Sequence, residues 1–440
     1  MAEVAGFPYF ELQFDKQGKV FDPNELQQAV NSIGQGAFTD LFVISHGWNN
    51  DMADARALYR ELLVRLREVI ESGKAPTGTR KFAVLAVLWP SKKFADEELI
   101  PSGAASAGSP VTAAVVNKQL DALKGVFDNP NADAVLAQAK QLVPQLETSP
   151  AARAQFADLV RSLPGNNTGA TEDASDRFFK LAGRELMDRL AKPASAAPPG
   201  PGSGGGAAGL RAGGPGGGAA GLGSFFSGIF SSARNLLNFT TYYQMKERAG
   251  LVGRTGASEA LRSIRAQAPN LKVHLIGHSF GGRLVTAVAL GPEGKPTQKF
   301  ASMTLLQAAF SHNGFAQKFD GTHDGFFRNV VSGHRINGPV LITCTTNDVA
   351  VGLAYPLASL VAGQNASGIG DAKDPFGGIG RNGAQHTPEA SAGTLAAVGS
   401  AYSFESGKIF NLNADAVIKG HSDICKPEVA YAVLKAVATT

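Results

Sequence analysis

Ser279 is the residue whose surroundings point most directly to chemistry. It lies in the stretch Gly277-His278-Ser279-Phe280-Gly281, which has the spacing Gly-x-Ser-x-Gly. On a very sharp turn the neighbouring side chains would collide, and glycines on both sides of the serine remove that collision. A serine hydroxyl on such a turn can act as a nucleophile once a nearby base takes its proton. The chain has 52 glycines in 440 residues, so the context of this pattern decides its meaning.

The residues around Ser279 predict a strand that leads into a helix. Val273, Leu275 and Ile276 are typical of a buried parallel strand. Apolar residues then recur at helical spacing from 284 to 289, before Gly291-Pro292 ends the helix. The alternatives are a glycine-rich turn with an uninvolved serine, or a phosphate-binding loop. The second fits poorly because no Lys-Ser/Thr pair follows the glycines.

Other polar residues follow further predicted strands. His46-Gly47-Trp48 comes after the apolar strand 38–45, and Asp348 comes directly after the strand 340–345. His421 follows the last predicted strand, 408–412, and precedes the C-terminal helix. A carboxylate after strand 340–345 would emerge at the C-terminal edge of a parallel sheet.

Taken together, these features resemble the α/β-hydrolase superfamily, over residues 38–89 and 271–440. The resemblance implies an α/β fold with a mostly parallel central sheet flanked by helices. It also implies a catalytic triad in which Ser279 is the nucleophile, Asp348 the acid and His421 the base, in that family's chain order. The carboxylate would hold the imidazole and its positive charge in place.

The resemblance further assigns an oxyanion site to the loop His46-Gly47-Trp48. The backbone N–H groups of Trp48 and Phe280 would stabilise the charge that develops on the substrate oxygen. His46 could equally be a buried histidine that braces this loop, and His278 would support the turn because its side chain would point away from the nucleophile. The supporting residues in this prediction are His46, Gly47, Gly277, His278 and Gly281.

Other residues compete for these roles. Asp320 and Asp324 are weaker candidates for the acid because no predicted strand directly precedes them, and Asp348 could instead cap a helix. His386 is the second candidate for the base. It lies in the glycine-rich segment 363–399, which is predicted to be a long surface loop.

The alternation of strands and helices stops for roughly 180 residues after Pro90, which is far more than a crossover connection needs. We therefore predict a hydrolase core formed by residues 1–90 and 251–440, with a helical cap insertion at 91–250. Residues 192–223 consist almost wholly of Ala, Pro, Gly and Ser and are predicted to be a disordered linker. Helices are predicted at 111–127, 132–142, 151–163 and 175–191.

Apolar residues recur at roughly helical spacing between 225 and 237. Such a face could cap an acyl pocket or contact a lipid surface. A cap helix packed on the main domain explains it equally well. The residues of this face are Phe225, Phe226, Ile229, Phe230, Leu236 and Leu237.

Composition limits the partners. The formal charge of +4 comes from 41 Lys and Arg against 37 Asp and Glu without a block of like charge, which argues against a nucleic-acid partner. No metal-binding pattern occurs, so neither a metal nor another cofactor is expected. Cys344 and Cys425 exclude a disulfide scaffold and leave one bond between them open. Without a secretory signal or about 18 successive apolar residues, we expect a cytoplasmic protein.

These observations predict a serine hydrolase that cleaves small-molecule or lipid-like carboxylic esters, of the esterase or lipase type, through an acyl-enzyme. The preference for esters depends on the apolar face in the insertion, because the same triad serves thioesters, lactones and amides. One alternative is a catalytically silent hydrolase fold used as a binding or scaffold module. Another is a protein that binds lipid surfaces through residues 225–237. The oligomeric state stays open.

Overall fold

The computed structural model describes residues 2–91, 111–164, 175–191, 228–348, 350–351 and 375–440. The chain divides into two compact units. The first comprises Met1–Lys93, Lys246–Val351 and Gly378–Thr440, and the second comprises Phe94–Met245 and Gly352–Gly377. Among the helices of the described ranges, none combines the length and the hydropathy needed to cross a membrane.

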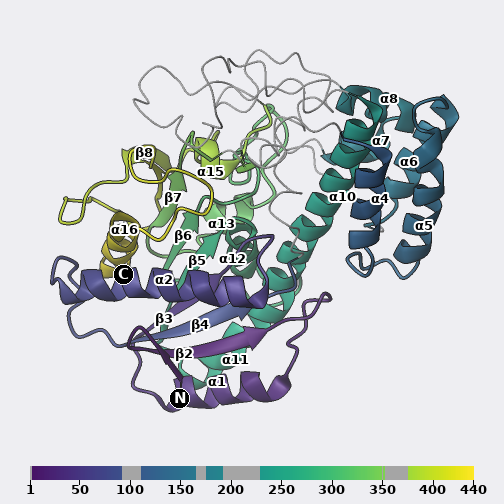
Figure 1. Ribbon diagram of the computed structural model, residues 1–440. Coiled ribbons are helices and arrows are strands. Elements are labelled where there is room, and N and C mark those ends of the chain that lie inside the picture. The colour runs from purple at the N-terminus through teal and green to yellow at the C-terminus, as the bar shows by residue number, and fades with distance from the viewer. Residues whose placement is uncertain (1, 92–110, 165–174, 192–227, 349, 352–374) are drawn as a thin grey trace, which may run out of the picture. The chain divides into compact units, whose positions relative to one another are not determined.

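The first unit is built on a nine-stranded sheet with the strand order β1-β2-β4-β3-β5-β6-β7-β9-β8 (Figure 1). Only β1 runs antiparallel to its neighbour, so the predicted mostly parallel sheet is confirmed. The strands are β1 (Ala2–Val4), β2 (Phe7–Gln13), β3 (Asp40–Ser45), β4 (Phe82–Leu88), β5 (Lys272–His278), β6 (Ser302–Leu306), β7 (Val340–Cys344), β8 (Ala390–Thr394) and β9 (Ile409–Asn413).

Helices cover both faces of this sheet. Side chains alternate between the two faces along a strand, and Phe42 and Ile44 of β3 belong to one buried cluster with residues of α2 (Met52–Glu71) and α16 (Pro427–Ala438). The intervening Leu41 and Val43 are also fully buried, on the other face. That face carries α1 (Pro23–Gln35), α11 (Ser258–Gln267) and α12 (Phe280–Leu290) (Figure 1).

Two of these helices begin at residues that favour helix N-termini. Asp51 is the N-cap of α2, and its carboxylate accepts from the amides of Ala53 and Asp54. The Asp54 side chain accepts in return from the Asp51 amide, which completes a capping box. Pro427 opens α16, at the position where a missing N–H costs nothing.

One expectation about the strands is wrong. The predicted surface loop 363–399 contains β8, which pairs in parallel with β9. As an edge strand, β8 is little buried and lacks the apolar residues that would reveal it in the sequence. Residues 363–374 of that loop lie outside the described part.

The described part of the second unit is helical. Helices occur at all four predicted positions, and the last is divided into two shorter ones. The predicted linker 192–223 lies outside the described residues. The helices are α4 (Ala113–Ala122), α5 (Ala132–Leu142), α6 (Pro150–Arg161), α7 (Ser175–Lys180) and α8 (Gly183–Leu190).

The apolar segment 225–237 lies partly in α10 (Ile229–Val252), which begins in the second unit and ends in the first. Leu236 and Leu237 are fully buried, which matches a packed helix. Phe225 and Phe226 lie outside the described residues.

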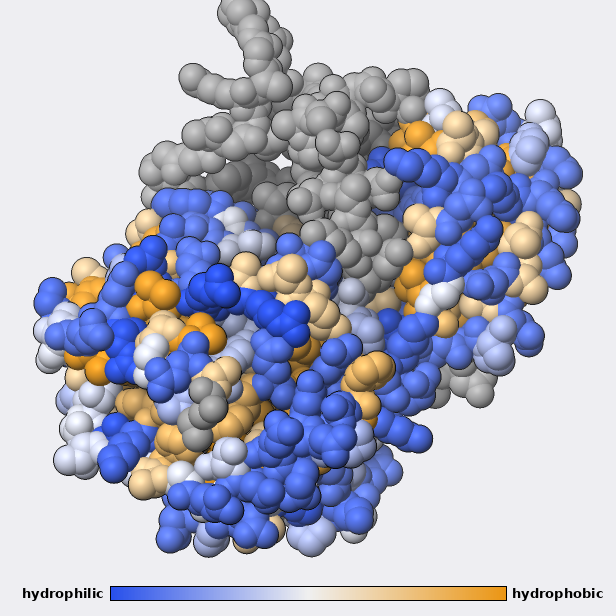
Figure 2. Space-filling model, turned by 60° about the horizontal axis from the view of Figure 1, so that its bottom comes forward, coloured by the Kyte–Doolittle hydropathy of each residue, from blue (hydrophilic) through white to orange (hydrophobic). Residues whose placement is uncertain are grey.

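On the face shown in Figure 2, hydrophilic residues predominate between small groups of hydrophobic ones.

Candidate active site

Ser279 occupies a strained turn between β5 and α12. Its backbone has φ 56° and ψ −126°, a conformation that residues with a side chain rarely adopt. Glycines permit this turn: a Cβ at Gly277 would lie 2.3 Å from the Gly281 carbonyl oxygen, and one at Gly281 would lie 2.1 Å from that of Ser45. The predicted strand, turn and helix therefore form around the serine.

A chain of hydrogen bonds joins Ser279 to the two residues predicted to act with it. The Nε2 atom of His421 lies 2.9 Å from Ser279 Oγ, and its Nδ1 atom lies 2.8 Å from Asp348 Oδ2. An ionised carboxylate only accepts, so Nδ1–H donates to Asp348 and the neutral ring accepts the serine proton at Nε2. The geometry thus has the donor order needed for serine activation.

Asp348 is completely buried, and its second oxygen has a separate partner. Oδ1 accepts from the Val351 amide at 2.9 Å, so the capping alternative and the bond to His421 hold at the same time. Burial alone would lower the pKa of His421, but the charge of Asp348 and its hydrogen bond outweigh burial and raise that pKa above 6.5.

The competing residues make other contacts. Asp320 forms an exposed pair with His323 at 2.7 Å, and Asp324 accepts from the Lys318 amide. His386 is exposed. None of these three takes part in the hydrogen bonds described for Ser279.

The loop predicted to form the oxyanion site lies directly against the serine. A Cβ at Gly47 would be 2.4 Å from Ser279 Cβ and 2.9 Å from its Oγ, so only glycine permits this approach. The next residue is Trp48, whose ring lies 6.0 Å from that of Phe280. The two amides predicted as oxyanion donors therefore belong to the residues that follow Gly47 and Ser279.

His46 braces this loop. Its ring is buried, which lowers the pKa of His46 to about 4 and keeps it neutral. Its Nε2 accepts from the Trp89 amide at 3.3 Å, so Nδ1–H donates to the Gly47 carbonyl at 2.9 Å. The Tyr59 hydroxyl accepts from the His46 amide at 2.7 Å and donates to Val87.

Asp415 is a site residue that the sequence analysis missed. Its carboxylate accepts from the Thr345 hydroxyl at 2.6 Å and the Thr346 amide at 2.8 Å, and Asn347 donates to its carbonyl at 3.0 Å. Burial opposes ionisation, but these bonds hold the pKa of Asp415 below its ordinary value. The loop that carries Asp348 is thereby tied to the loop that leads to His421. An aspartate two residues after the last strand was the signal available in the sequence.

Gln307 was also missed. It follows β6, is fully buried, and has a φ of 44°. Its side-chain amide donates to the Gly380 carbonyl at 2.8 Å and lies 3.5 Å from Asp348 Oδ2. Gln307 thus contacts Asp348 from the end of a neighbouring strand.

A second Ser-His-Asp set lies near the N-terminal ends of the central strands β3, β5 and β6, at the opposite end of these strands from Ser279. His274 Nδ1 is 2.8 Å from Ser302 Oγ, and His274 Nε2 is 2.9 Å from Asp40 Oδ1. Asp40 also forms an ion pair with Arg80. The three members expose at most 2% of their surface, so a substrate cannot reach this set.

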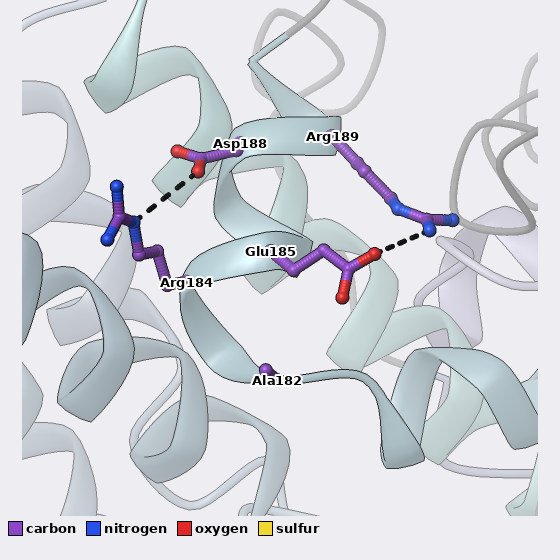
Figure 3. Close-up of a pocket in the computed structure, with 5 residues that line it drawn as sticks. All are labelled: Ala182, Arg184, Glu185, Asp188 and Arg189. Carbon is purple, nitrogen blue, oxygen red and sulfur yellow. Dashed lines mark hydrogen bonds and ion pairs between the residues drawn. The ribbon is translucent and has the colours of Figure 1, made fainter.

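Other candidate chemistry is weak. Among the described residues, no group of three or more His, Cys, Asp or Glu could hold a metal ion. Cys344 and Cys425 are free, buried thiols whose pKa values burial raises to about 12. In the second unit, a hollow of about 600 Å³ is lined by five residues around α8 (Figure 3). Its charged side chains form two ion pairs, Arg184 with Asp188 and Arg189 with Glu185, and no serine, cysteine or histidine lines it.

Comparison with known proteins identifies the class. A family model described as the alpha/beta hydrolase fold matches residues 247–348, a range that contains Ser279 and Asp348. Comparisons with curated proteins and with solved structures gave no match. This match and the mostly parallel nine-stranded sheet support membership of the chain in the α/β-hydrolase superfamily. The fold indicates hydrolase activity in general.

Proposed function

We propose that this protein is a serine hydrolase that cleaves carboxylic esters through an acyl-enzyme. The observation that carries the proposal is the chain of hydrogen bonds from Ser279 through His421 to Asp348, with the serine on a strained turn. Strain of this kind is costly and persists where the surrounding structure imposes it. It supports a functional role for the serine.

In the proposed reaction, His421 Nε2 takes the Ser279 proton as Oγ attacks the ester carbonyl carbon. The tetrahedral intermediate then collapses, and His421 gives the proton to the leaving alkoxide. Water next gives a proton to His421 and attacks the acyl group. Collapse of the second intermediate returns the proton to Ser279 and releases the carboxylic acid. Asp348 stabilises the imidazolium in both halves.

The amides of Trp48 and Phe280 are the proposed oxyanion donors. The close approach of Gly47 to Ser279 supports this assignment, since the Trp48 amide follows Gly47 directly. Phe280 begins α12, so the positive end of the helix dipole faces the region of Ser279. Rigid donors there would stabilise the developing charge without reorganising.

An ester of a small molecule or lipid is the proposed substrate. The basis is the apolar composition of the sequence 225–237 alone, since Leu236 and Leu237 are buried and residues 225–227 lie outside the described part. Because pocket shape, not the triad, selects a substrate, esters of increasing acyl length are the direct probe.

The test is labelling of the purified protein with a fluorophosphonate probe, followed by turnover of p-nitrophenyl esters. Ser279→Ala should abolish labelling and lower kcat by more than about 10³-fold. Ser302→Ala is the matched control, since Ser302 also bonds to a buried histidine, and it should label normally. Failure of the folded wild type to label would favour the catalytically silent alternative. Labelling of Ser279→Ala would exclude Ser279 as the nucleophile.

A further inference from the structure

His278 is next to the proposed nucleophile in the sequence and contacts the backbone of the proposed base. It is the last residue of β5, directly before Ser279, and exposes only 5% of its surface. Its Nε2 atom lies 2.9 Å from the backbone carbonyl oxygen of His421, and the two imidazole rings are 4.9 Å apart. The side chain therefore points to the loop that carries the base.

The proton position on His278 follows from this contact. A carbonyl oxygen only accepts, so Nε2 carries the hydrogen and a neutral His278 has a lone pair on Nδ1. Among the described residues, that buried Nδ1 atom has no hydrogen-bond partner. Burial, reinforced by the charge of His421, lowers the pKa of His278 to about 3. The other titratable groups that act on it are Asp348 and His46, and the ring stays neutral while His421 titrates.

The loop around His421 needs such an anchor. Residues 419–426 contain no helix or strand, and several of their hydrogen bonds are local. The Lys419 amide donates to Asp423 Oδ2 at 3.0 Å, and the Asp423 amide donates to Gly420 at 3.2 Å. The bond from His278 instead crosses 143 positions in the sequence and joins this loop to a central strand.

We propose that His278 is a positioning residue that holds the His421 backbone, so that the His421 ring stays between Ser279 and Asp348. The inference rests on the proposed function, and it differs from the sequence-based expectation that His278 supports the turn. One strand end carries both the nucleophile and the group that orients its base. A ring with two torsions is well suited to this task, because little conformational freedom is lost when it is ordered.

The test compares His278→Leu with His278→Gln. Leucine removes the donor, whereas the glutamine amide nitrogen can reach the place of Nε2. His278→Leu should lower the rate of fluorophosphonate labelling and kcat by about 10- to 100-fold, since small misplacements of a catalytic group have effects of this size. KM should stay within about twofold. His278→Gln should recover most of the loss.

A spectroscopic readout separates positioning from general stability. The proton on His421 Nδ1, which is bonded to Asp348, should give a downfield NMR signal that weakens in His278→Leu and returns in His278→Gln. The control is His274→Gln, a buried histidine on the same strand, which should lower stability and leave both the signal and the labelling rate of folded protein unchanged.

Labelling of His278→Leu at the wild-type rate, or an equal loss in His278→Gln, would overturn the proposal. If His278→Leu does not fold, His278→Asn replaces it, because its shorter amide cannot reach the His421 carbonyl. The failure of the proposed function is distinguishable: the wild type would then not label, while the NMR signal would still report whether His278 positions His421.

Discussion

The two Ser-His-Asp sets of this protein have almost the same hydrogen bonds. In the candidate active site the serine and carboxylate contacts of His421 measure 2.9 and 2.8 Å, and in the buried set those of His274 measure 2.8 and 2.9 Å. Both sets are built on the parallel strands of one sheet. Side-chain distances alone therefore do not separate a catalytic arrangement from a structural one.

The difference lies in the backbone and in the charges around each set. Ser279 stands on a turn with positive φ, whereas Ser302 is the first residue of a regular strand. Asp40 also pairs with Arg80. Burial dominates at His274 and lowers its pKa, while Asp348 raises that of His421. A histidine that takes up a proton readily, beside a serine on a sharp turn, is suited to acid–base chemistry. The set around His274 is suited to a structural role.

The largest difference between the two sets is expected when their carboxylates, Asp348 and Asp40, are replaced. Asp348→Asn should lower kcat by about 10⁴-fold, because the amide can donate to His421 and favour the wrong tautomer. Asp40→Asn should instead lower the free energy of unfolding by about 3 kcal/mol, because it breaks a buried ion pair with Arg80. Ester turnover per folded molecule and urea unfolding measure the two effects. Loss of turnover in folded Asp40→Asn would contradict a purely structural role for the set around His274.

The second-largest difference between the two sets is expected at the loop that contains Gly47, because Gly47 lies close to Ser279. Gly47→Ala places a Cβ within 2.4 Å of Ser279 Cβ, so the loop must move, and we expect labelling to slow by about 100-fold. Gly250→Ala is the control, because its nearest neighbour would be Arg283 at an ordinary 3.6 Å. Equal rates for both variants would remove the loop from the mechanism.

The pH dependence of turnover should reflect the raised pKa of His421. Serine activation needs a neutral His421, so kcat/KM should fall as pH drops through a value above 6.5. The sign for stability is the reverse: protonation of His421 favours the folded state below the unfolded pKa, and this contribution is lost as pH rises through the folded pKa. A pH–rate profile of the wild type measures the first effect. An acidic limb well below pH 6.5 would contradict it.

The smallest effect is expected at the buried serine. Ser302→Ala removes one hydrogen bond to His274 and should lower the free energy of unfolding by about 1 kcal/mol. Turnover should not change. Thermal unfolding and ester hydrolysis, measured on the same preparation, would reveal whether the two sets are independent; a fall in kcat would show that they are coupled.

Much of the candidate site could be predicted because its signals are local. The glycines around Ser279 meet a steric need of the turn itself, and Asp348 directly follows an apolar strand. Asp415 and Gln307 could not be predicted from local signals. Their importance depends on partners that are far away in the sequence, and an aspartate or glutamine at the end of a strand is common in any α/β protein.

The same limit applies to the fold. Strongly apolar strands such as β3 and β4 were predictable because both of their faces are buried. The edge strand β8 was missed because it has little to bury.

By itself, the sequence determined the strand–turn–helix unit around Ser279 and the parallel sheet, since these depend on local sterics and on apolar periodicity. Only the tertiary structure decided which histidines meet which carboxylates. Asp40, His274 and Ser302 meet because β3, β5 and β6 are neighbours in the sheet. His278 reaches the His421 carbonyl because the loop after β9 folds back over the end of β5. Such pairings depend on strand order and loop paths, which no local pattern encodes.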